Sequence, residues 1–441
     1  MTNYSDNTLT NSQTPQFYNA QGLALAARGQ VNSAIQAFKQ AVNQDPEYVD
    51  AYFNLALANA GRGDIQAAME NYRCCLRLNP DHVASWYNLA NTLSRIKYFN
   101  AAIEAYHRVI ELDPQHALAF NNLGLALIKS AKIAEAIQHF KQAIALQTDF
   151  AEAHYNLGAA YLHLGDKVRA EAQFQTTLNI DKHYSPAVFH LGNLYLEMNK
   201  PQKAISMFQQ YLQYHPQHAA ALNNLGNVYH RQGQETAAVS CYKKSIQFNP
   251  NNAQTYYNLA NALQASDNAG EAISFYHKAL TFEPRWPEAC NNLGTAYQKQ
   301  GLLGEATAQF QKALEWRPDY AQALNNLGIV YRLQGRIKAA IACYRAALQI
   351  KPEYSECHSN LLFGLNYDPN LDQKDLFQEA SGWWNKHGLP IANKFKHCNT
   401  RDPNRRLKIG YVSADFRRHP VGFFFLPLAM GHKHDNFEVS C

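Results

Sequence analysis

The sequence predicts an all-α solenoid of stacked helix pairs, followed by the beginning of an α/β domain. An Asn-Leu-Gly or Asn-Leu-Ala motif returns every 34 residues through most of the chain, starting at Asn54. A period of this length is typical of repeats that bury their apolar faces only against their neighbours. After Leu365 the helical period is lost, and residues 405–413 read as a strand.

The register of the repeats follows from positions that recur. Ten repeats of 34 residues fill residues 15–354, and an eleventh begins at Ser355. Position 20 is alanine in all ten, and proline at position 32 ends the second helix of most repeats. Glycine is common at position 15, where a left-handed residue closes the first helix. These positions define the tetratricopeptide repeat, so the sequence predicts an all-α tetratricopeptide-repeat superhelix over residues 15–365.

Composition favours a soluble, cytoplasmic protein that does not enter a membrane. No apolar run approaches the length that crosses a bilayer. Residues 1–14 are polar and lack the blocks of a secretory signal, so we expect a disordered N-terminal segment. The last 41 residues hold seven of the 40 Lys and Arg and four of the 35 Asp and Glu. The first 400 residues are therefore nearly neutral, which argues against nucleic acid as a partner. The eight cysteines include no CxxC pair, so we expect no metal site.

Position 6 carries asparagine in most repeats, and we expect these side chains to be exposed on the concave wall of the solenoid. A carboxamide both donates and accepts, so such a row can grip the backbone of an extended polypeptide acceptor or partner protein in the concave groove. The alternative, that asparagine serves local helix packing here, stays open. If the row is exposed, its removal should barely change folding stability. The row comprises Asn54, Asn88, Asn122, Asn156, Asn224, Asn258, Asn292, Asn326 and Asn360, and His190 interrupts it.

Beyond the repeats, residues 366–405 predict a connector helix and a loop. Asp368-Pro369-Asn370 signals a helix start, and the amphipathic stretch that follows stops at Gly388. Residues 406–441 read as strand, loop, helix and strand, the opening βαβ portion of an α/β domain. One βαβ unit cannot bury both faces of a parallel sheet, so we expect the chain to stop early in its second domain.

One run of residues in this segment is specific to a family. The run Arg406-Leu-Lys-Ile-Gly-Tyr-Val-Ser-Ala-Asp-Phe-Arg-Arg-His-Pro-Val-Gly422 resembles the first strand and active-site loop of the O-GlcNAc transferase family, in its bacterial form. Residues 359–370 are similar to the junction of repeats and catalytic region in those members. The resemblance implies an inverting glycosyltransferase with two Rossmann-like lobes and no metal, which moves N-acetylglucosamine from UDP-GlcNAc to Ser or Thr of polypeptides. Because the donor lobe would lie beyond Cys441, we expect the chain to be inactive alone.

The resemblance assigns a catalytic candidate, His419, which matches the histidine of the family's Asp-Phe-x-x-His-Pro loop. An imidazole can accept the proton of the acceptor hydroxyl or hydrogen-bond a sugar or phosphate oxygen, so base and positioning residue both stay open. Arg417 and Arg418 either contribute to a phosphate-binding field or are solvated surface residues. Two other functions stay open. The family includes O-fucosyltransferases that use GDP-fucose, and the repeats alone fit a tetratricopeptide scaffold for protein–protein interaction without catalysis.

Overall fold

The computed structural model of the chain describes residues 14–392, 407–410 and 437–440. The chain divides into two compact units, residues 1–309 and residues 310–441. The described residues are helical apart from two short strands. The predicted N-terminal segment, the loop before residue 407 and the catalytic candidate His419 lie outside the described residues.

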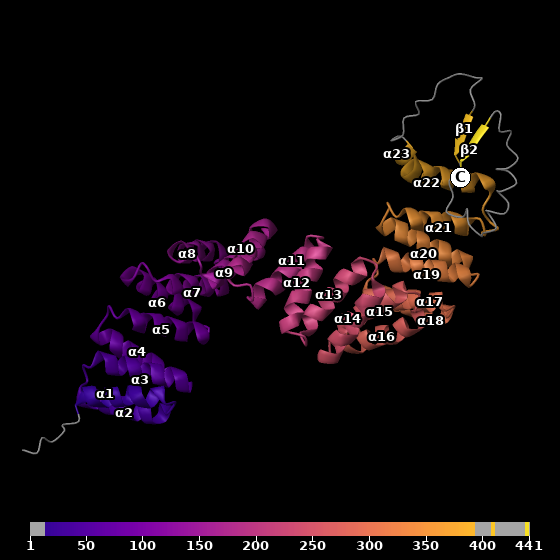
Figure 1. Cartoon of the computed structure of the whole chain (residues 1–441). Helices are drawn as coiled ribbons and strands as arrows, with labels where there is room; N and C mark the ends of the chain where they lie inside the picture. Colours follow the sequence, from indigo (N-terminus) through magenta and orange to yellow (C-terminus); the bar gives the residue numbers. More distant parts are fainter. Residues whose placement is uncertain (1–13, 393–406, 411–436, 441) are drawn as a thin grey trace, which may run out of the picture. The chain divides into compact units, whose positions relative to one another are not determined.

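Helices follow one another as pairs, one pair to each repeat (Figure 1). The first unit contains α1 (Pro15–Ala27), α2 (Val31–Gln44), α3 (Val49–Arg62), α4 (Ile65–Leu78), α5 (Val83–Arg95), α6 (Phe99–Leu112), α7 (Ala117–Lys129), α8 (Ile133–Leu146), α9 (Ala151–His163), α10 (Lys167–Ile180), α11 (Ser185–Glu197), α12 (Pro201–Tyr214), α13 (Ala219–Arg231), α14 (Glu235–Phe248), α15 (Ala253–Ala265), α16 (Ala269–Phe282) and α17 (Pro287–Lys299).

Helix α18 (Leu303–Trp316) spans the boundary at residue 310. The second unit continues with α19 (Ala321–Leu333), α20 (Ile337–Ile350), α21 (Ser355–Leu365), α22 (Gln373–Trp383), the π-helix η1 (Trp384–Gly388), α23 (Leu389–Ala392), β1 (Leu407–Gly410) and β2 (Phe437–Ser440). The connector helix α22 begins later than predicted, because Asp372 rather than Asp368 caps it and accepts a hydrogen bond from the backbone N–H of Asp375 at 2.8 Å.

A left-handed residue separates the two helices of every complete repeat. Six repeats place glycine at position 15 with φ between 70° and 90°, as predicted. The other four adopt the same conformation without glycine, at Lys97, Ala131, Asn199 and Asp267, with φ between 54° and 66°. The packing of the two helices therefore imposes this conformation even where the residue pays a steric cost.

The core is built from the recurring small and aromatic positions. All ten alanines at position 20 are fully buried, and so are the aromatic rings at position 24, such as Phe140 and Tyr242. Where position 8 is glycine, the ring lies directly against its Cα: a Cβ built on Gly124 would lie 2.5 Å from Cε1 of Phe140. The helices of a pair can approach this closely because neither the alanine nor the glycine keeps them apart.

Within each unit, the first helices of neighbouring repeats contact one another. In the first unit these contacts join α1, α3, α5, α7 and α9 in order, and also α11, α13, α15 and α17; in the second unit α19 contacts α21. We call the side that these helices form in each unit the odd-helix face. It carries positions 6, 9, 12 and 13 of each repeat and therefore every asparagine of the predicted row.

The strands β1 and β2 pair in parallel, with Leu407 opposite Phe437 and Gly410 opposite Ser440. Both lie where the sequence predicts strands. The helix predicted between them, at residues 422–430, lies outside the described residues, so the βαβ unit stays a prediction. What the structure establishes is the all-helical repeat array.

Candidate functional site

The predicted asparagines lie on the odd-helix face, but they are not exposed. Eight of the nine are half-buried, and Asn156 is buried. The expectation of an exposed row is therefore wrong. For seven of them the amide N–H groups donate into the preceding repeat instead of pointing into solvent.

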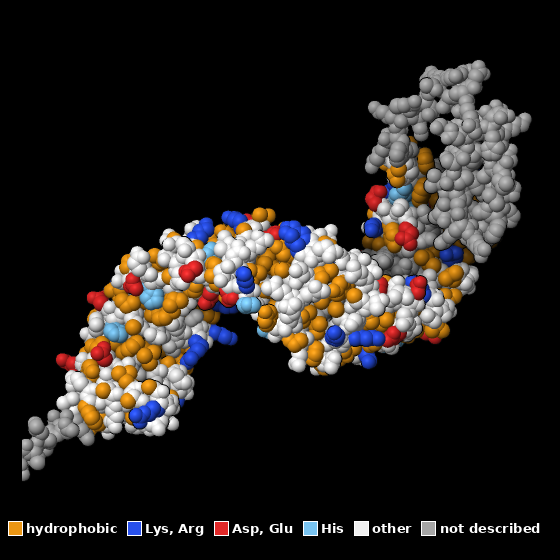
Figure 2. All heavy atoms as spheres, in the orientation of Figure 1, with side chains coloured by type: hydrophobic (Ala, Val, Ile, Leu, Met, Phe, Trp, Pro, Cys, Tyr) orange, Lys and Arg blue, Asp and Glu red, His pale blue; other side chains and the backbone are white. Residues whose placement is uncertain are grey.

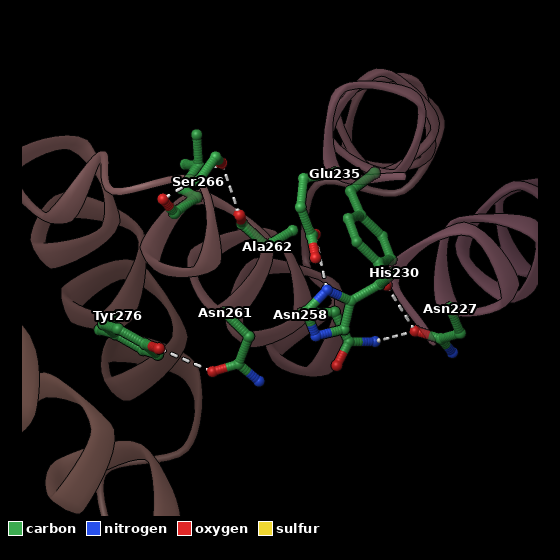
Figure 3. Close-up of polar contacts among 10 residues, drawn as sticks. Asn227, His230, Glu235, Asn258, Asn261, Ala262, Ser266 and Tyr276 are labelled. Carbon is green, nitrogen blue, oxygen red and sulfur yellow. Dashed lines mark hydrogen bonds and ion pairs between the residues drawn. The ribbon is translucent and has the colours of Figure 1, made fainter. Parts of the chain in front are cut away.

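The contacts of Asn258 illustrate the arrangement (Figure 3). Its Nδ2 donates to Oδ1 of Asn223 at 3.1 Å and to Oδ1 of Asn227 at 3.0 Å, both on the preceding odd helix, α13. The hydroxyl of Tyr242 also donates to Oδ1 of Asn227, at 2.8 Å. The asparagine at position 6 of one repeat thus donates hydrogen bonds to positions 5 and 9 of the repeat before it. Position 9 in turn accepts a hydrogen bond from the tyrosine at position 24 of its own repeat. Tyr276 donates to Asn261 at 2.6 Å in the same way.

The same link recurs along the array, always from the Nδ2 of a position-6 asparagine to position 5 or 9 of the preceding repeat. The bonds join Asn54 to Asn19 (3.0 Å), Asn122 to Tyr87 (3.1 Å) and Asn91 (3.1 Å), Asn156 to Asn121 (2.9 Å), Asn224 to Asn193 (2.7 Å), Asn292 to Tyr257 (2.9 Å) and Asn261 (3.0 Å), and Asn360 to Asn325 (3.0 Å).

Asn88 and His190 make other contacts. The repeat before Asn88 carries Phe53 and Leu57 at positions 5 and 9, which offer no side-chain acceptor, and Nδ2 of Asn88 donates to the carbonyl of Ala84 in its own helix at 2.8 Å. His190 is stacked on Phe174, with ring centroids 5.7 Å apart. Burial lowers the pKa of His190, which keeps its imidazole neutral.

The tyrosines and position-9 asparagines of this network were missed by sequence reasoning. The signal was present: Asn91, Asn227 and Asn261 each occur in a repeat with tyrosine at position 24. Burial raises the pKa of Tyr242 and Tyr276, so both hydroxyls stay protonated donors.

The carboxamide oxygens retain accepting capacity. Oδ1 of Asn122, Asn224 and Asn292 accepts one bond from the adjacent position-5 asparagine, at 3.2–3.3 Å. Because a carbonyl oxygen carries two lone pairs, each can accept a further N–H. The row can therefore accept hydrogen bonds from a ligand through its Oδ1 atoms, whereas most of its Nδ2 groups already donate between repeats.

These links lead to a stability prediction. We expect Asn258→Ala to lower the free energy of unfolding by about 2 kcal/mol, since it removes two hydrogen bonds between half-buried groups and leaves their acceptors poorly satisfied. Asn88→Ala should change it by less than about 0.5 kcal/mol, because it makes no bond between repeats. Denaturant unfolding monitored by circular dichroism compares the two, and equal effects would contradict the structural role of the row.

The described residues contain no group of three or more His, Cys, Asp or Glu side chains placed to hold a metal ion. No described helix is long and apolar enough to span a membrane. On the face drawn in Figure 2, Lys and Arg side chains are interspersed with Asp and Glu. His419, Arg417 and Arg418 lie outside the described residues, so their roles stay predictions.

A relative and several solved structures resemble parts of the chain. Over 82 residues it is 35% identical to the probable UDP-N-acetylglucosamine–peptide N-acetylglucosaminyltransferase SPINDLY of Petunia hybrida. That match covers 18% of this chain and 9% of the relative's length. Among solved structures, MamA is 25% identical and covers 37% of this chain and 96% of its own, with a TM-score of 0.36. YrrB, described as a TPR protein with an unusual peptide-binding site, is 23% identical to this chain. The match covers 45% of this chain and 100% of YrrB, with a TM-score of 0.39.

Sequence models of the tetratricopeptide repeat match the chain in successive segments. The matched residues are 22–63, 49–82, 83–116, 128–165, 151–184, 189–253, 241–274 and 288–353. Together with the 34-residue period and the helix pairs of the structure, these matches show that the chain belongs to the tetratricopeptide repeat proteins.

Proposed function

We propose that the odd-helix face binds extended polypeptides, and that this chain is part of a protein O-linked N-acetylglucosaminyltransferase. The observation that carries the binding proposal is the row of asparagines at one-repeat spacing on the odd-helix face. An extended backbone presents N–H groups at regular intervals, and a line of carbonyl acceptors can take them without reading side chains.

The hydrogen bonds from Nδ2 to the preceding repeat limit which atoms of the row can bind a ligand. Both N–H groups of Asn258 and of Asn292 are used between repeats, so these residues would contribute only their Oδ1 atoms. Asn88 makes a bond only within its own helix, so it can turn toward a ligand without loosening the stack. We therefore place the strongest single contribution to binding at Asn88.

The test measures binding of a short unstructured peptide by titration calorimetry. Asn88→Ala should weaken binding about fivefold, since one hydrogen bond contributes about 1 kcal/mol. The control is Asn71→Ala on α4. Asn71 is also half-buried and its Nδ2 also donates to a carbonyl of its own helix, that of Ala67 at 2.6 Å, but it lies on an even-numbered helix. Unchanged affinity of Asn88→Ala, or an equal loss in both variants, would remove the asparagines from the binding site.

The enzymatic part of the proposal rests on two sequence likenesses. Residues 406–422 resemble the active-site loop of O-GlcNAc transferases, and 82 residues are 35% identical to a relative named as such an enzyme. In this proposal the repeats hold the acceptor polypeptide and the donor is UDP-GlcNAc. His419 accepts the proton of the acceptor hydroxyl or positions that hydroxyl. The competing proposal is a repeat scaffold without catalysis. It is favoured by the small part of the relative, 9%, that the match covers.

Glycosyl transfer separates the two proposals. In a polypeptide that includes the complete glycosyltransferase region, His419→Ala should reduce transfer about a hundredfold, as expected for loss of a general base or of a group that positions the acceptor. His432→Ala is the control, because the sequence places it after the predicted helix and away from the loop. Transfer of radiolabelled sugar from UDP-GlcNAc to a peptide is the measurement. Near-normal transfer by folded His419→Ala would refute the site, and no transfer by the unmutated enzyme would favour the scaffold.

A further inference from the structure

A cluster of one cation and two aromatic rings lies on the odd-helix face of the second unit. Phe363 follows Asn360 by three residues along α21, so both side chains project from the same side of that helix. Arg332 of α19 reaches this side with its guanidinium, which lies over the Phe363 ring. Tyr367 lies against Phe363, with ring centroids 5.4 Å apart and an interplanar angle of 58°.

Both rings of the cluster are open to solvent. Phe363 is 48% exposed and Tyr367 is 57% exposed, and Leu333, at the end of α19, is 52% exposed. Single exposed apolar residues are ordinary. Here two exposed rings lie in contact with each other, three residues along α21 from Asn360, which makes an apolar surface suited to another ring.

Arg332 gives the cluster a charge that the described residues do not neutralise. Its guanidinium carbon lies 4.7 Å from the centroid of the Phe363 ring. Among the described residues no carboxylate forms an ion pair with it, its Nε is buried without a hydrogen-bond partner, and the guanidinium lies beside the Tyr344 hydroxyl. A guanidinium held on a ring and partly removed from water is complementary to a carboxylate.

We propose that this cluster binds an aromatic side chain of the polypeptide, next to an acidic residue. The aromatic ring would pack on Phe363 and Tyr367, and the neighbouring carboxylate would pair with Arg332. This inference rests on the proposed binding of extended polypeptides and adds a preference to it: the asparagine row accepts any backbone, whereas the cluster selects an acidic–aromatic segment. The occupant is a polypeptide because the cluster continues the face that carries Asn326 and Asn360.

The preference is tested with two short fluorescein-labelled peptides in a Ser, Gly and Thr background, alike except that one carries Trp-Asp at its centre and the other Ala-Asn. Fluorescence anisotropy with this chain should show about tenfold tighter binding of the Trp-Asp peptide, and high salt should reduce the difference. Arg332→Gln and Phe363→Ala should each remove most of the preference and leave binding of the Ala-Asn peptide unchanged. Phe377→Ala, which alters a 72% exposed ring on α22, should keep the preference.

Each outcome decides the inference. Loss of the preference in Arg332→Gln and Phe363→Ala, with circular dichroism unchanged, supports it. Equal affinities of the two peptides for the unmutated chain, or a preference that survives in both variants, overturn it and leave the asparagine row standing. Failure of both peptides to bind overturns it together with the proposed polypeptide binding.

Discussion

We expect Gly124→Ala to lower the free energy of unfolding of the fourth repeat by about 3 kcal/mol, because it overfills a closed part of the core. The added Cβ would lie 2.5 Å from Cε1 of Phe140, whose side chain is fully buried. Because the ring is fully buried, the ring or the two helices α7 and α8 must shift to make room. Since each repeat is held mainly by its neighbours, the loss should extend into the third and fifth repeats.

The same substitution elsewhere provides the control. Gly61 lies within α3, and a Cβ built on it meets no heavy atom within 4 Å. Gly61→Ala should therefore raise stability by about 0.5–1 kcal/mol, the usual gain of alanine over glycine in a helix. Amide hydrogen exchange gives local opening energies for both variants, which global unfolding of a repeat array does not. Unaltered protection of α7 and α8 in Gly124→Ala would contradict the packing described for position 8.

The second large effect concerns acid. We expect the repeat array to lose stability as the pH falls from 7.5 to 5.5, in part through His218, which caps α13 and whose cap contributes about 1 kcal/mol. Nδ1 of His218 accepts the backbone N–H of Ala221 at the start of this helix, at 3.1 Å. A backbone N–H can only donate, so Nδ1 must be unprotonated. Proton binding replaces this bond with a positive charge at a helix N-terminus.

Buried histidines also make the folded chain less stable as the pH falls. Burial lowers the pKa of His139, His190 and His218 below the ordinary value of 6.5. As the pH falls below about 6.5, the unfolded chain binds protons that the folded chain does not, so the stability that is complete above this pH is lost toward the folded pKa values.

The chain itself suggests the variant that tests the cap. Asn252 occupies the equivalent position before α15 and accepts the N–H of Thr255 at 3.1 Å, with no titration in this range. His218→Asn should keep the cap and make stability depend less steeply on pH, while His139 and His190 retain their part of the dependence. The asparagine also removes a ring contact, that of His218 with Phe189 at 5.2 Å, so the slope of stability against pH is compared rather than its absolute value. An unchanged slope would exclude the cap as a cause.

The sequence by itself determined the repeat architecture. The 34-residue period, alanine at position 20 and proline at position 32 predict where helices begin and end, because these depend on neighbouring residues and on side-chain size. It also identified position 15 as left-handed where glycine stands. The sequence could not identify the left-handed conformation of Ala131 and Lys97, because there the packing of two helices, and not the residue type, selects a positive φ.

The state of the candidate site was decided only by the tertiary structure. The sequence correctly placed asparagines in register on the first helices, and it left open whether they face a ligand or pack. The Nδ2 partners between repeats are 31 or 35 residues away, so whether Asn258 meets Asn223 and Asn227 depends on the stacking of whole repeats. Local pattern fixes which side of a helix a side chain occupies, whereas exposure depends on the neighbour that the fold brings against it.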